Sequence, residues 1–140
     1  MPKYGKTSQA RLDTCHPLQK KLWEEVIKVF DCSILCGHRP MEEQNALFFN
    51  YHPPRTRCMW PDSKHNSLPS IAVDAAPYYA EKPHIRWDKK SLYRWYYFGG
   101  RVVEIARHME IPIRWGGDWD RDTYVLDQNL MDLPHFELIL

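Results

Sequence analysis

Residues 63–78, SKHNSLPSIAVDAAPY, run from a polar loop into a short apolar segment that carries one carboxylate. Apolar residues alternate along IAVDAAPY (71–78), which predicts a strand in which Asp74 interrupts an otherwise small, apolar surface. His65 lies late in the loop, nine residues before Asp74. A buried carboxylate is costly unless it pairs with a base or binds a metal. Taken alone, Asp74 is explained most simply by an ion pair with one of the 19 Lys and Arg residues.

A second histidine with acidic neighbours occurs near the end of the chain, in DLPHFEL (132–138). The segment HFELIL (135–140) predicts a last strand, in which His135 and Glu137 share one face because side chains alternate. Asp132 precedes His135 by three residues, and Pro134 predicts a turn between them. A half-buried strand histidine bonded to Asp132 is the simpler explanation of this pair.

Together, His65, Asp74 and His135 offer two imidazole nitrogens and one carboxylate oxygen. Three such ligands suit a tetrahedral zinc ion that keeps its fourth position for water, as in catalytic zinc sites. Asp132 would then be free to act as general base toward the bound water. No HExxH-type signature is present, so residue spacing alone leaves the structural and the catalytic explanations open.

The rest of the chain predicts helices interleaved with short strands, and therefore an α+β fold in one small domain. We expect helices, strands and one long loop in the following ranges: helices over 17–30, 41–49 and 89–109, strands over 33–39 and 71–78, a strand and turn over 111–119, and a loop over 51–70. The pair Gly99-Gly100 suggests close packing or a bend in the last helix.

Composition excludes several classes of protein. The 19 basic and 18 acidic residues give a net charge of +1, which offers no electrostatic case for nucleic acid or an anionic membrane. No run approaches the ~18 apolar residues of a membrane span, and the first residues lack the apolar segment of a secretory signal. We therefore expect a cytoplasmic protein with free thiols. Cys32 and Cys36 have no second Cys or His pair at finger-like spacing, which argues against a structural zinc finger.

Several segments together resemble one family of enzymes. SKHNSLPSIAVDAAPY and DLPHFEL resemble the paired signatures S-x-H-x(n)-A-x-D and [DE]-x-x-H of zinc peptidases that cleave peptidoglycan stem peptides. This family includes D-alanyl-D-alanine carboxypeptidases and the L-alanyl-D-glutamate endopeptidases that serve tailed phages as endolysins. The segment GHRPMEEQNALF (37–48) also resembles the family. Two more segments resemble its endolysin branch: YGKTSQARLDTCHPLQKKL (4–22), and 86–120 with its WGGDW turn.

The resemblance implies roles for individual residues. His65, Asp74 and His135 match the ligands of one Zn²⁺ per chain, and Asp132 matches the catalytic carboxylate. Arg39 matches the arginine that faces the scissile carbonyl, where a guanidinium stabilises the oxyanion.

Other matches lie around these residues. Ser63 matches a serine that binds substrate, and Gln44 a residue that shapes the site. Asp118, Trp115 and Trp119 match the WGGDW turn, where they either pack the turn or support a ligand. The chain departs from the commoner pattern at Ser70, which replaces a glycine, and in its His65–Asp74 interval, which is nine residues instead of seven.

The function implied is that of an endolysin that hydrolyses the L-alanyl-D-glutamate bond, with zinc-bound water as nucleophile and Asp132 as general base. Two alternatives remain: a D-alanyl-D-alanine carboxypeptidase, and a non-catalytic zinc-containing binding module of the same fold. Residues 1–140 are expected to form a single, monomeric catalytic domain without a wall-binding domain. The partner would be bacterial peptidoglycan, and a holin-type factor would release the protein from the host cytoplasm at lysis.

Overall fold

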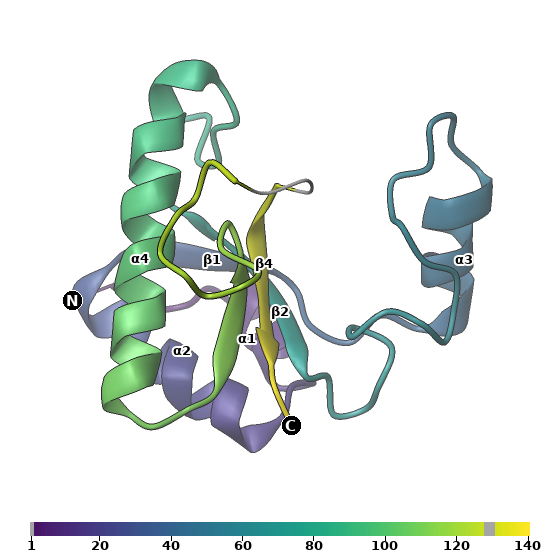
Figure 1. The fold of residues 1–140 in the computed structure, drawn as a ribbon, viewed down its shortest axis with the longest axis horizontal. Helices are drawn as coiled ribbons and strands as arrows, with labels where there is room; N and C mark the ends of the chain where they lie inside the picture. Colours follow the sequence, from purple (N-terminus) through teal and green to yellow (C-terminus); the bar gives the residue numbers. More distant parts are fainter. Residues whose placement is uncertain (1, 128–130) are drawn as a thin grey trace.

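The computed structural model describes residues 2–127 and 131–140, which form an α+β fold (Figure 1). The helices in these ranges are α1 (Lys6–Leu12), α2 (Pro17–Val29), α3 (Met41–Phe49), the short 3₁₀ helix η1 (Lys89–Ser91) and α4 (Leu92–His108). The strands are β1 (Cys32–Cys36), β2 (Ala72–Pro77), β3 (Ile113–Gly116) and β4 (Asp132–Leu138). None of the described helices is long and apolar enough to cross a membrane.

The strands form one antiparallel sheet in the order β1-β2-β4-β3. In its centre, β2 pairs with β4 so that Asp74 lies opposite His135 and Val73 lies opposite Phe136. Because side chains alternate along a strand, these two pairs point to opposite faces of the sheet. One face therefore receives the core and the other receives the polar residues.

The core forms where α4 packs against α2 and against strands β2, β3 and β4. Trp23 of α2 meets Phe136 of β4 edge to face with ring centroids 5.1 Å apart, and both side chains are fully buried. Phe98 of α4 fills the same cluster, 6.1 Å from Trp23. Aromatic burial of this kind anchors β4 and its polar face in position.

The close packing expected at the glycine pair is confirmed at its first member. A Cβ on Gly99 would collide with the ring of Trp115, whereas one on Gly100 would meet open space. Gly99 thus lets α4 approach β3 closely enough for Trp115 to be buried.

Most of the predicted elements are confirmed, with shifted ends. Helix 17–30 corresponds to α2, helix 41–49 to α3, and no helix or strand interrupts the described loop over 51–70. The strand predicted over 33–39 ends at Cys36. Helix α1 was not predicted, because seven residues with no side-chain cap at Gly5 give little periodic signal.

The expected turn at Pro134 is wrong. Strand β4 begins at Asp132 and includes Pro134. The register is irregular here: Gly116 pairs with Asp132, while Trp115 already pairs with Phe136. Pro134 lies inside this irregularity, where a residue without an N–H is tolerated.

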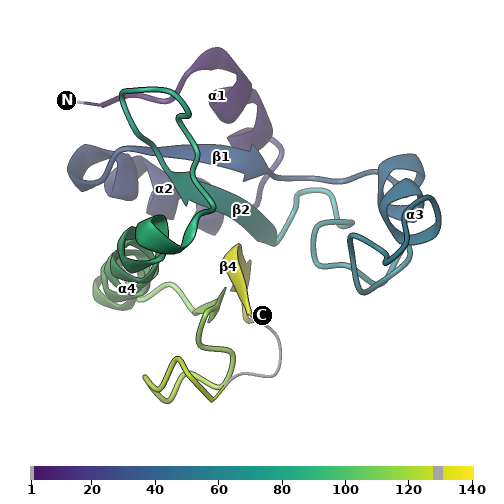
Figure 2. The same cartoon turned by 90° about the horizontal axis from the view of Figure 1, so that it is seen from above.

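Helix α3 and the loop after it extend away from the sheet as an arm (Figures 1 and 2). The chain then returns to the sheet at Ser70, whose N–H donates to Thr14 O and whose O accepts from His16 N–H. Ser70 is fully buried, and its hydroxyl also bonds Ala72. This anchor fixes the point from which β2 begins.

Candidate active site

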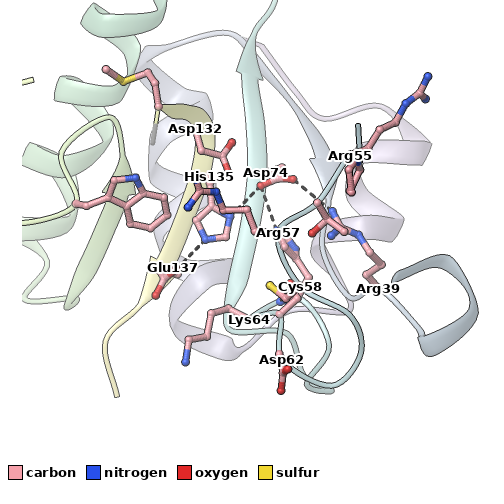
Figure 3. Close-up of a pocket in the computed structure, with 16 residues that line it drawn as sticks. Arg39, Arg55, Arg57, Cys58, Asp62, Lys64, Asp74, Asp132, His135 and Glu137 are labelled. Carbon is pink, nitrogen blue, oxygen red and sulfur yellow. Dashed lines mark hydrogen bonds and ion pairs between the residues drawn. The ribbon is translucent and has the colours of Figure 1, made fainter. Parts of the chain in front are cut away.

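A pocket of about 560 Å³ opens between the loop over 54–65 and the polar face of β2 and β4 (Figure 3). Its walls contain most of the residues singled out by the sequence. Those of them that line it are Arg39, Ser63, His65, Asp74, Trp119, Asp132 and His135.

The three predicted metal ligands converge on one carboxylate oxygen. Oδ1 of Asp74 lies 3.1 Å from Nε2 of His65 and 3.3 Å from Nδ1 of His135. The two imidazole rings are 5.2 Å apart between centroids. Asp74 and His135 meet because they are paired across the sheet, whereas His65 arrives from the loop.

The loop histidine is held in place by its backbone and by its ring. His65 O accepts a hydrogen bond from the N–H of Arg39 at 2.8 Å, and His65 N–H donates to Oγ of Ser63 at 3.2 Å. Nδ1 of the ring lies 2.8 Å from the carbonyl oxygen of Gly37. A carbonyl only accepts, so this contact requires the proton on Nδ1 and directs Nε2 at Asp74.

The strand histidine is held from its other side. Nε2 of His135 lies 2.9 Å from Oε1 of Glu137, and the Trp119 ring lies 5.5 Å from the His135 ring between centroids. The alternation of side chains along the strand predicts that Glu137 shares a face with His135, but no sequence motif indicates a role for it. The other partner of Glu137 is Arg114 of β3, and this contact can be identified only from the pairing of β3 with β4.

Burial and charge oppose each other in this cluster. Burial alone would raise the pKa of Asp74 and lower that of both histidines, but their mutual attraction outweighs it. The pKa of Asp74 therefore lies well below its usual range, and those of His65 and His135 lie above theirs. Burial likewise opposes ionisation of Glu137, yet hydrogen bonds from His135 and Arg114 lower its pKa to about 2.

The residues present fit a zinc ion. Both imidazoles use their outward nitrogen for a protein acceptor and aim the other at Asp74, which gives two nitrogens and one carboxylate oxygen around one point. This is a donor set that catalytic zinc accepts. The raised histidine pKa values mean that a metal must displace protons to bind.

A second donor set overlaps the first. The ligand atoms of Cys36, His65 and Asp74 all lie within 4.8 Å of one another, so a thiol is a further possible ligand. Cys36 pairs with Asp74 across β1 and β2, after an irregularity that follows Ile34. Sequence spacing gave no signal for this residue, because the irregularity decides which β1 residue faces Asp74.

We expect Cys36→Ser to bind zinc with the affinity of the unsubstituted protein, because His135 completes the ligand set without the thiol. The hydroxyl preserves the size of the side chain while removing a good zinc ligand. Chelator competition measures the affinity, and cobalt substitution reports any thiolate ligand through its charge-transfer absorption. Loss of zinc in Cys36→Ser together with full binding in His135→Ala would assign the ligand role to Cys36.

Arg39 faces Asp74 from the loop side of the pocket. Its Nη2 lies 3.7 Å from Asp74 Oδ2, and its Nη1 donates to Oε1 of Gln44 at 2.9 Å. Gln44 is fully buried and also donates to the carbonyl oxygen of Cys58. Gln44 therefore connects Arg39 to the loop over 51–70. Arg39 Nε is buried without a hydrogen-bond partner among the described residues.

Asp132 lies at the start of β4, on the wall beside the histidines. Burial, followed by the negative charge of Asp74, raises its pKa, while His135, His65 and Arg39 act in the opposite direction. A carboxylate with a raised pKa holds a proton more readily than a solvated one. Asp132 therefore has the property that a general base needs.

The WGGDW turn supports the site at its edge. Trp115 is buried, donates its indole N–H to Leu133 O at 2.8 Å, and stacks on Phe136. Asp118 accepts from the backbone N–H groups of Asp122 and Thr123 and so organises the turn itself. Of the three predicted turn residues, Trp119 is the one that lines the pocket.

The α+β fold brings a His–Asp–His cluster, a flanking carboxylate and an arginine into one pocket, which is a set of groups that suits a hydrolase. A family model described as phage L-alanyl-D-glutamate peptidase matches residues 1–139. The chain belongs to this family, which confirms the resemblance seen in its sequence and supports a peptidase that acts on peptidoglycan.

The fold is also found in a crystal structure, that of the Serratia marcescens L-Ala D-Glu endopeptidase ChiX. The two structures superpose with a TM-score of 0.72 at 22% sequence identity, over 98% of this chain and 90% of that one. At this identity the likeness establishes the fold, and it confirms the predicted α+β class. No curated protein matches the chain.

Proposed function

We propose that the protein is an endolysin, a zinc peptidase that hydrolyses the L-alanyl-D-glutamate bond of the peptidoglycan stem peptide. The observation that carries this proposal is the convergence of His65 and His135 on Asp74, beside Asp132 and Arg39, in a chain of this peptidase family. His65, Asp74 and His135 would hold the zinc ion.

Zinc bound at these ligands supplies a Lewis acid that makes water a better nucleophile at neutral pH. Asp132 accepts a proton from the attacking water and returns it to the departing amine nitrogen, for which its raised pKa is suited. Arg39 lines the pocket and offers guanidinium donors to the negative charge that develops on the carbonyl oxygen. Gln44 keeps that guanidinium in place.

A carboxypeptidase that removes terminal D-alanine would use the same residues, so metal chemistry does not choose the bond. The family description favours the endopeptidase. The non-catalytic binding module is disfavoured, because Asp132 and Arg39 are both present at the pocket and neither is needed merely to hold a metal.

Mass spectrometry of the peptides released from purified peptidoglycan tests the choice. We expect new N-terminal D-glutamate on the released peptides and glycan strands that retain L-alanine. Peptidoglycan treated with Asp132→Asn protein serves as the control for contaminating hydrolases. Free D-alanine as the sole product, with the stem otherwise whole, would establish the carboxypeptidase instead.

We also propose that residues 1–140 act as one monomeric catalytic domain, held in the host cytoplasm until a holin-type factor gives it access to the wall. The phage family supports this role. Light scattering of the purified protein should return a mass near 16.8 kDa.

A further inference from the structure

Glu137 is a buried carboxylate that the mechanism above does not use. It lies on β4 two residues after His135, and 5% of it is exposed. Its two oxygens have different partners: Oε1 lies 2.9 Å from Nε2 of His135, and Oε2 accepts from Nη2 of Arg114 at 2.8 Å. Figure 3 shows Glu137 on the side of His135 that faces away from Asp74.

The sheet builds this arrangement. Arg114 of β3 is the cross-strand partner of Glu137, so the guanidinium and the carboxylate meet directly. The Arg114 guanidinium also lies over the Trp119 ring, 5.8 Å from its centroid. Glu137 is therefore fixed by β3 while it contacts a residue of its own strand.

An ionised carboxylate only accepts hydrogen bonds, so the contact with Glu137 places a proton on Nε2 of His135. The nitrogen that can exchange its proton for a metal is then Nδ1, which lies 3.3 Å from Asp74 Oδ1. In the opposite tautomer, Nδ1 would carry the proton and could not be a ligand. In His65 the Gly37 carbonyl places the proton on Nδ1, and Nε2 is the nitrogen that faces Asp74.

We propose that Glu137, held by Arg114, is the positioning residue that selects the His135 tautomer and ring orientation for metal binding. The inference rests on the proposed zinc site. Partners of this kind raise the basicity of a ligating imidazole, and their loss commonly costs 10–100-fold in metal affinity or activity. Glu137 acts through His135 and takes no part in bond cleavage.

The experiment measures zinc affinity by chelator competition and the imidazole N–H signals of zinc-loaded, ¹⁵N-histidine-labelled protein. We expect Glu137→Ala to weaken zinc binding by about 10–100-fold and to remove the Nε2–H signal of His135 through exchange with water. Arg114→Met should give a smaller loss of affinity, because it leaves the carboxylate without its anchor. The Arg114 side chain is 37% exposed, so this change is mild for the fold.

The matched control is Glu104→Ala, which removes a carboxylate from an exposed ion pair with Arg107 on α4. Its zinc affinity and imidazole signals should equal those of the unsubstituted protein. A folded Glu137→Ala protein with unchanged affinity and an intact Nε2–H signal would overturn the inference. If Glu137→Ala does not fold, unchanged affinity and signals in Arg114→Met would overturn it. Failure of the unsubstituted protein to bind zinc would count against the proposed function instead.

Discussion

His65→Ala, Asp74→Ala and His135→Ala are each expected to lose most of the bound zinc and, with it, the hydrolysis of peptidoglycan. Three protein ligands are the minimum for a catalytic zinc site, so two leave the ion weakly held. Asp74→Ala is expected to lose the most zinc, because both imidazoles contact the Asp74 carboxylate. Elemental analysis after dialysis gives zinc per chain, and clearing of a cell-wall suspension gives activity.

His108→Ala is the control for these substitutions, since it removes an exposed histidine at the end of α4. It should retain one zinc per chain and full activity. Full zinc occupancy in all three ligand variants would refute the assignment. Removal of either histidine takes away one of the two imidazoles that lower the pKa of the buried Asp74. Circular dichroism must therefore show that each variant is folded before its metal content is compared.

Asp132→Asn is expected to keep the fold and the zinc ion yet lose at least ~10²-fold in the rate of wall hydrolysis, because an amide cannot act as general base. Arg39→Ala should cost on the order of 10²-fold or more through lost oxyanion stabilisation. Initial rates and zinc content are measured on the same preparations. Loss of rate with full zinc content distinguishes Asp132 and Arg39 from the proposed zinc ligands.

The Arg39 result needs a conservative companion, because Arg39 also bonds Gln44. Arg39→Lys keeps the positive charge but loses the planar fork of donors, so it should recover only part of the activity. Either Asp132→Asn or Arg39→Ala hydrolysing walls at the unsubstituted rate would remove that residue from the mechanism.

The sequence predicted that His65, Asp74 and His135 lie together, because each of them belongs to a short motif. The period of two placed His135 and Glu137 on one face, and the interruption of an apolar strand marked Asp74. The remaining contacts depend on pairing between distant strands. The nearness of Cys36 follows from an irregular register in β1, and the Arg114–Glu137 pair follows from the register of β3. The burial of Gln44 behind Arg39 depends on how α3 and its loop fold back, which no local pattern encodes.

The three proposed metal ligands lie on different kinds of structural element. Asp74 and His135 are paired in the middle of the sheet, so separating them requires the sheet to open. His65 lies in a loop, where its carbonyl accepts from Arg39 N–H and its ring contacts the carbonyl oxygen of Gly37. Local opening of a loop costs far less free energy than opening of a central strand pair. Exchange of the ion with solution is therefore expected to proceed by release of His65, at a rate set by the loop and faster than global unfolding.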